Sequence, residues 1–125
     1  MRWLAGPGAA LVLVTGLVFA AAAELDTAVM ESLEVVSESL ASNIALADVA
    51  AARTDAADLQ SLFAEVQAHF AARGDAVDAV EYAKKSRELA GAVRVALEAG
   101  KFDDAANAAS EIGRTCKACH RKYKP

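Results

Sequence analysis

Residues 25–47 read LDTAVMESLEVVSESLASNIALA, and their apolar side chains recur every three or four positions. This spacing places them on one face of an α-helix of about six turns. The residues on the apolar face are Leu25, Val29, Leu33, Val36, Leu40, Ile44 and Ala47. Acidic side chains lie mostly off that face, so the stretch predicts an amphipathic helix that buries one side.

Two further helices are expected between Thr54 and Gly100. Thr54 is a suitable N-cap for the second helix because acidic residues follow in its first turn, and Gly74 can end it in a left-handed conformation. Its apolar residues are Leu59, Leu62, Phe63, Val66 and Phe70. Asp75 can cap the third helix, which Gly100 ends. Its apolar face runs through Val77, Val80, Ala83, Ala90, Val93 and Leu97.

A fourth helix is expected to begin at Asp103 or Asp104. One side of it carries Ala106, Ala109, Ile112, Cys116 and Tyr123. No proline occurs between residues 25 and 124, and alanine is abundant, both of which favour helix. Four amphipathic helices with short connections predict an all-α fold, an antiparallel four-helix bundle.

The first 23 residues are typical of a secretory signal peptide. Met1-Arg2 gives a positive start, residues 9–19 form an apolar core, and residues 21–23 are three alanines suited to cleavage. The mature domain would then span residues 24–125. An uncleaved anchor is the alternative, but the core is short and interrupted by glycine. We therefore expect a periplasmic protein with no integral membrane span after signal removal.

The charges are distributed unevenly. The chain has 13 basic and 17 acidic residues, and its net charge is −4, which is not the profile of a nucleic-acid-binding protein. Residues 114–125 nevertheless contain no acid and five cations: Arg114, Lys117, Arg121, Lys122 and Lys124. Such cations complement a helix C-terminal dipole, or form a basic rim that steers an acidic partner. The two interpretations are compatible.

Both cysteines of the chain lie in the run Cys116-Lys117-Ala118-Cys119-His120. In a helix, Cys116, Cys119 and His120 share one face, at positions i, i+3 and i+4. This is the spacing of covalent haem c attachment, in which each thiol adds to a vinyl group and the histidine binds the iron. We therefore expect one covalent haem c. It would also supply apolar area that a small, alanine-rich bundle lacks.

Two other interpretations of the motif are weaker. A redox-active Cys-X-X-Cys pair favours a helix N-terminus, where the dipole lowers the thiol pKa, whereas this pair lies near the end of a helix. A zinc site needs further ligands, and His69 is the only other histidine. Its place near the end of the second expected helix is more typical of an exposed residue that complements the dipole.

The stretch IGRTCKACHRKYK, residues 112–124, closely resembles the C-terminal signature of class II c-type cytochromes. This superfamily comprises cytochrome c-prime and its low-spin, methionine-ligated relatives. Its signature is CKACH, then two residues, an aromatic and a basic residue, with a glycine three positions before the first cysteine; Gly113, Tyr123 and Lys124 match it. The resemblance is strong over residues 100–125. Over residues 24–99 it rests on helix layout and one methionine.

The resemblance implies a four-helix bundle whose last helix holds the haem. Cys116 and Cys119 would form the thioethers, and His120 would be the proximal axial ligand. Tyr123 would pack near the haem, and Lys124 would lie beside its proximal face. The chain departs from the family in being short between its second and third helices.

Met30 is the candidate for the distal axial ligand. It lies one turn before Leu33, so it can point inward, and it resembles the first-helix methionine of the low-spin relatives. A neutral thioether raises the haem potential and suits electron transfer. The alternative is a core methionine that fills a gap. The iron would then be five-coordinate, with a distal pocket lined by Val29 and Leu33.

These observations predict a periplasmic monohaem c-type cytochrome, a one-electron carrier for a redox protein partner rather than an enzyme. The alternative is a five-coordinate cytochrome c-prime that binds nitric oxide or carbon monoxide. A third hypothesis is a haem-free helical interaction domain with a regulatory disulfide. Family relatives include dimers formed through the first two helices, and the alanine-rich faces here are compatible with a homodimer.

Overall fold

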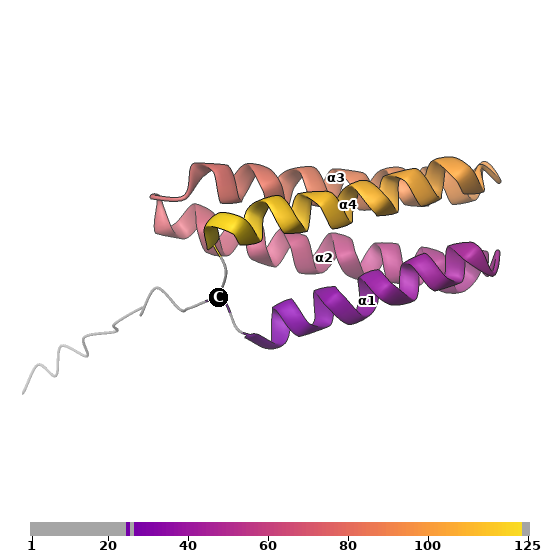
Figure 1. Cartoon of the computed structure of the whole chain (residues 1–125), viewed down its shortest axis with the longest axis horizontal. Helices are drawn as coiled ribbons and strands as arrows, with labels where there is room; N and C mark the ends of the chain where they lie inside the picture. The colour runs from indigo at the N-terminus through magenta and orange to yellow at the C-terminus, as the bar shows by residue number, and fades with distance from the viewer. Residues whose placement is uncertain (1–24, 26, 124–125) are drawn as a thin grey trace, which may run out of the picture.

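The computed structural model describes residue 25 and residues 27–123, and over this range it contains four α-helices and no strand. They are α1 (Thr27–Ala45), α2 (Val49–Arg73), α3 (Val77–Glu98) and α4 (Phe102–Tyr123). Successive helices run in opposite directions and lie side by side (Figure 1). The prediction of an all-α fold is confirmed. Residues 1–23, expected to be a signal peptide, and Lys124 lie outside the described residues.

The helices pack in a ring in which each contacts its neighbours in the chain. Contacts are most extensive between α2 and α3, followed by α3 and α4, and α1 and α2. The ring is closed by α1 against α4, where the contacts are fewest. In Figure 1 these two helices diverge toward the end of the bundle where α1 begins and α4 ends. These two helices carry Met30 and the cysteine motif.

Small residues explain the close approach of α2 and α3. The alanines of this part of the core are fully or almost fully buried: Ala52, Ala56, Ala79, Ala83 and Ala90. At Gly91 a Cβ atom would lie 3.0 Å from Gln60 Nε2, so a side chain there would press on α2. Arg94 donates a hydrogen bond to Gln60 Oε1 at 2.8 Å across the same interface.

Larger side chains fill the centre of the bundle. The largest that are fully buried include Leu40, Leu59, Val93 and Ile112, one from each helix. The expected apolar faces of α1 and α2 are therefore largely confirmed. Three predicted positions are wrong. Ala47 is exposed in the turn after α1, Val77 is 72% exposed at the start of α3, and Ala106 is exposed while its neighbour Ala105 is buried.

The second helix begins earlier than expected. Its N-cap is Asp48, whose Oδ1 accepts a hydrogen bond from the Ala51 backbone N–H at 3.1 Å. Thr54, the predicted cap, lies inside α2 and donates its hydroxyl to the Ala50 carbonyl. A tight turn at Ala47, which has a positive φ of 53°, makes this early start possible. No glycine or proline marks the turn, so sequence pattern could not locate it.

The connection between α2 and α3 follows the prediction only in part. Gly74 has a φ of 75° and ends α2, as expected. Asp75, however, does not cap α3; its carboxylate pairs with Arg73 at 3.1 Å. The N-cap position is taken by Ala76, whose side chain is buried instead of bonding to the helix.

Among the described residues, no helix is long and apolar enough to span a membrane.

Candidate functional site

A cavity of about 800 Å³ opens between α1 and α4, near the end of the bundle where these helices diverge. Cavities of about 300–1,000 Å³ are typical of sites that enclose a small molecule or cofactor. All four helices contribute to its wall. The cavity therefore lies where the closure of the helix ring is weakest, and α1 and α4 face each other across it.

The wall formed by α4 contains the cysteine motif. Cys116, Cys119 and His120 all line the cavity, as their i, i+3, i+4 spacing predicts. Both cysteines are free thiols and half-buried. His120 is exposed and makes no hydrogen bond or ion pair with the described part of the chain. Two thiols and an unbonded imidazole are thus directed from one helix into one cavity.

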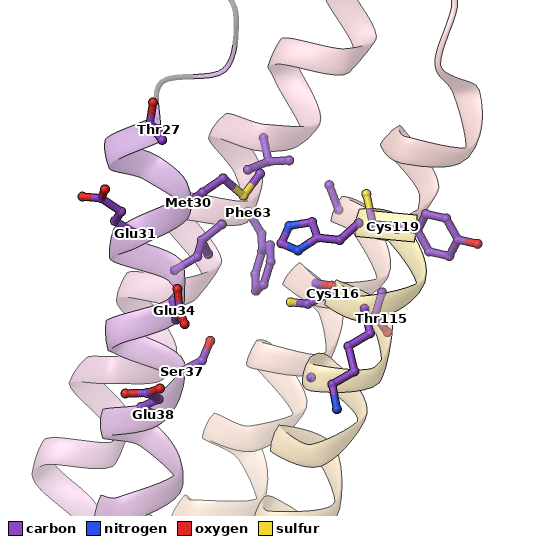
Figure 2. Close-up of a pocket in the computed structure, with 18 residues that line it drawn as sticks. Thr27, Met30, Glu31, Glu34, Ser37, Glu38, Phe63, Thr115, Cys116 and Cys119 are labelled. Carbon is purple, nitrogen blue, oxygen red and sulfur yellow. The ribbon is translucent and has the colours of Figure 1, made fainter. Parts of the chain in front are cut away.

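The wall formed by α1 contains Met30. This side chain is half-buried against the core and lines the same cavity. Figure 2 shows its thioether reaching from α1 toward α4, from which the Cys116 side chain points back. Met30 and Cys116 are 86 positions apart in the sequence. The bundle therefore brings Met30 and the cysteine motif to opposite walls of one cavity.

The deeper walls come from α2 and α3. Phe63 and Val66 on α2 supply apolar surface, and Figure 2 shows the Phe63 ring between Met30 and Cys116. On α3 the lining residues include Tyr82, Ala83 and Ser86. The floor is therefore mostly apolar, with hydroxyl groups on the α3 side.

Gly113 leaves an open position in the α4 wall, one turn before Cys116. A Cβ atom added there would have no protein atom within 4 Å, and its backbone does not have the positive φ that requires glycine. Glycine inside a helix costs about 0.5–1 kcal/mol relative to alanine. Nothing in the described chain explains that cost, whereas a group held close to α4 in the cavity would.

The environment of the thiols keeps them protonated. Burial raises the pKa of Cys116 above its usual value. Burial raises the pKa of Cys119, and the negative charges of Asp78 and of Cys116 when it is ionised raise it further. A redox-active Cys-X-X-Cys pair needs a lowered thiol pKa, so the structure argues against that interpretation on electrostatic grounds.

Three side chains join the last turn of α4 to the first turn of α3. Asp78 accepts a hydrogen bond from Lys122 Nζ at 2.6 Å and another from the Tyr123 hydroxyl. The bonds from Lys122 and Tyr123 hold the pKa of Asp78 at about 2. The Tyr123 ring packs on Phe70 of α2, with centroids 5.5 Å apart. Tyr123 therefore lies outside the cavity lining, and the structure gives it contacts with α2 and α3.

The mouth of the cavity carries both signs of charge. The α1 lip contributes the exposed carboxylates of Glu31, Glu34 and Glu38, and the α4 lip contributes the ammonium group of Lys117. Two other cations of the basic C-terminal stretch are engaged elsewhere: Lys122 pairs with Asp78 and Arg114 pairs with Glu111. The described lining of the mouth is therefore mixed in charge, whereas a basic rim was one of the two compatible interpretations of the sequence.

His69 takes no part in this site. It is half-buried on α2, and its ring meets Phe70 edge-on with centroids 5.0 Å apart. It does not line the cavity. Among the described residues, no group of three or more His, Cys, Asp or Glu side chains is arranged to hold a metal ion. His69 therefore lies apart from Cys116 and Cys119 and does not join them in the zinc site considered from the sequence.

The donors fit a haem better than a bare metal ion, because the porphyrin itself supplies four ligands and the protein needs to supply only axial ones. An imidazole and a thioether on opposite walls are such a pair, and two half-buried thiols beside the imidazole suit covalent attachment. The mostly apolar floor and the open position at Gly113 are further points of fit.

No protein-family model, curated protein or solved structure matches this chain. The interpretation of the site therefore depends on its residues and geometry.

Sequence pattern missed three residues of this region. Asp78 looked like an ordinary acid in a first helical turn, and nothing local indicates a partner 44 positions away. Ser86 interrupts an apolar face, which is a weak signal of a cavity. Phe63 was expected in the core, but not beside Met30.

Proposed function

We propose that this chain is a one-electron carrier with a single covalently attached haem c, of the class II cytochrome type. The observation that supports the proposal is the convergence of Cys116, Cys119, His120 and Met30 on one cavity. The cysteine motif lies on α4 and Met30 lies on α1, so the local spacing of the motif does not by itself bring Met30 to the same cavity. The haem would supply an iron that changes between ferric and ferrous states.

The residues of α4 would hold the cofactor. Cys116 and Cys119 would form the thioethers, and their protonated, half-buried state suits addition to a vinyl group in which the thiol supplies both sulfur and hydrogen. His120 would be the proximal ligand. Its imidazole is free of other bonds within the described chain, so no interaction has to be broken for it to bind iron.

Met30 would be the distal ligand. A thioether is a neutral ligand that favours ferrous iron and raises the reduction potential, as suits an electron carrier. Phe63 and Val66 would exclude water from this side. Exposed Glu31 and Glu34 beside Met30 would leave the mouth accessible to a redox partner, and the mixed charges there would orient that partner.

The second candidate is a five-coordinate haem that binds nitric oxide or carbon monoxide. It is favoured by the apolar surface of Leu33, Phe63 and Val66, which would remain as a distal pocket if Met30 only fills space. The haem-free domain with a regulatory disulfide has less support, because the pKa values of both thiols are raised. We also propose export to the periplasm, on the basis of residues 1–23.

An absorption spectrum distinguishes the three. The protein would be exported in cells that co-express haem-attachment factors, purified, reduced and exposed to carbon monoxide. A low-spin ferrous spectrum that carbon monoxide does not change is the expected result. A high-spin spectrum that shifts on carbon monoxide addition would favour the five-coordinate form. The absence of a Soret band would leave the haem-free domain. Mass spectrometry after denaturation would show whether a haem is covalently attached.

A further inference from the structure

His120 lies in the last turn of α4, so the contacts that hold this turn decide where the imidazole points. The His120 side chain makes no hydrogen bond or ion pair with a described residue, and α1 is separated from α4 here by the cavity. Cys119 packs against the core, and the polar contacts between this turn and other described residues are those of Lys122 and Tyr123, which follow His120 within one helical turn. Both of these side chains bind the same carboxylate, that of Asp78.

Asp78 is held firmly on its own helix. It lies in the first turn of α3, and its Oδ1 also accepts a hydrogen bond from the Ala79 backbone N–H at 3.1 Å. Negative charge is favourable at a helix N-terminus. The carboxylate that receives the two donors from α4 is therefore also oriented by a contact within α3.

Tyr123 makes the attachment directional. Its ring contacts Phe70 of α2 at a centroid distance of 5.5 Å, while its hydroxyl binds Asp78 of α3. Phe70 is 5% exposed, and its ring also lies 5.4 Å from the Arg73 guanidinium. The last turn of α4 is thus fixed to two helices, and it cannot rotate about its axis without breaking either the ring contact or the hydrogen bond.

We propose that Asp78 is the positioning residue of His120: through Lys122 and Tyr123 it fixes the rotation and depth of the last turn of α4, and thereby the direction of the imidazole into the cavity. This role rests on the proposed function, in which His120 binds the haem iron. An isolated surface ion pair contributes little to stability. Asp78 differs from such a pair because two donors from α4, and one from α3, converge on it.

Asp75 provides a matched control. It lies three positions before Asp78 and is exposed, and within the described part of the chain its carboxylate pairs only with Arg73 of the preceding helix. The variants to compare are Asp78→Ala, Asp78→Asn, Tyr123→Phe and Asp75→Ala. Asp78→Asn keeps an acceptor for the tyrosine hydroxyl but loses the charge, and Tyr123→Phe keeps the ring contact with Phe70 but loses the hydroxyl. These two milder variants decide the outcome if Asp78→Ala does not fold.

The experiment measures two properties of the haem-loaded proteins. Amide hydrogen exchange over residues 118–123 reports how often the last turn of α4 opens. The g-values of the ferric electron paramagnetic resonance spectrum report the orientation and strength of axial ligation. We expect exchange to become roughly tenfold faster in Asp78→Ala, with broadened or shifted g-values. Asp78→Asn and Tyr123→Phe should show smaller changes of the same kind, and Asp75→Ala should match the parent protein.

Three results would overturn the proposal. Unchanged exchange in the Asp78 variants would show that the last turn does not depend on this carboxylate. Faster exchange with an unchanged resonance spectrum would show that Asp78 only stabilises the helix end and does not position the ligand. If the unmutated protein carries no attached haem, the proposed function is wrong. The role of Asp78 in positioning His120 toward the haem is then wrong as well.

Discussion

Gly113→Ala is expected to stabilise the haem-free protein but not the haem-loaded protein. In the described chain a Cβ atom at this position meets no atom within 4 Å, and the residue is inside α4. Alanine is the better helix former by about 0.5–1 kcal/mol. The haem-free protein should therefore gain that much stability, which for a domain of this size raises the melting temperature by about 2–8 °C.

The haem-loaded protein should not show this gain. Gly113 lines the cavity one turn before the first cysteine, so a methyl group there would compete for space with a group held against α4. Overpacking of a filled site costs about 1–3 kcal/mol, which exceeds the gain in helix propensity. We therefore expect the substitution to lower the melting temperature of the loaded protein, or at best to leave it unchanged.

The assay is thermal unfolding followed by far-ultraviolet circular dichroism. Haem-free protein would come from cytoplasmic expression of residues 24–125, and loaded protein from export with haem-attachment factors. Gly91→Ala is the control, because its Cβ would meet Gln60 Nε2 at 3.0 Å in the α2–α3 interface, away from the cavity lining. Its effect should be the same in both forms. Equal stabilisation of both forms by Gly113→Ala would refute the argument that the cavity beside α4 is filled.

Three further predictions follow from single residues. Met30→Ala should convert a low-spin haem to one that is high-spin and binds carbon monoxide, as measured by absorption spectroscopy; an unchanged spectrum would eliminate Met30 as a ligand. Ala47→Gly should stabilise the protein by about 1 kcal/mol in urea unfolding, because alanine is strained at a φ of 53°; destabilisation would contradict the strain. The folded-state pKa of Asp78, about 2, lies below its usual value of 3.8, so its contribution to stability is complete above about pH 4 and is lost as the pH falls toward 2. Urea titrations between pH 5 and 2 should accordingly show a shallower loss for Asp78→Asn than for the parent protein, and parallel curves would argue against the bonds from Lys122 and Tyr123.

Helix boundaries show where local sequence information was sufficient. Gly74 and Gly100 ended helices as predicted, because both adopt the positive φ that glycine tolerates best. Thr54 and Asp75 were wrongly predicted as caps. The turn at Ala47 carries no glycine or proline, so an alternative start at Asp48 had no sequence signal. At Asp75 the side chain has a competing partner, Arg73, and burial of Ala76 decides the start of α3.

The role of Tyr123 shows where a motif was insufficient. The class II resemblance places an aromatic residue near the haem, and the structure shows its ring against Phe70 and its hydroxyl on Asp78. Both partners belong to other helices. The basic C-terminal stretch is a second case in which contacts outside the motif decide a role. Lys122 and Arg114 are paired with acids and are not arranged around the cavity mouth.

The sequence by itself determined the elements and the chemistry on each of them. Amphipathic periods define four helices, and the spacing of Cys116, Cys119 and His120 places three donors on one face, because helix geometry repeats every 3.6 residues. Only the tertiary structure decided that Met30 lies on the opposite wall, that α1 and α4 separate enough to leave a cavity, and that Asp78 holds the end of α4. Those relations depend on how side chains far apart in the chain interdigitate between helices, and no local pattern records which of them will meet.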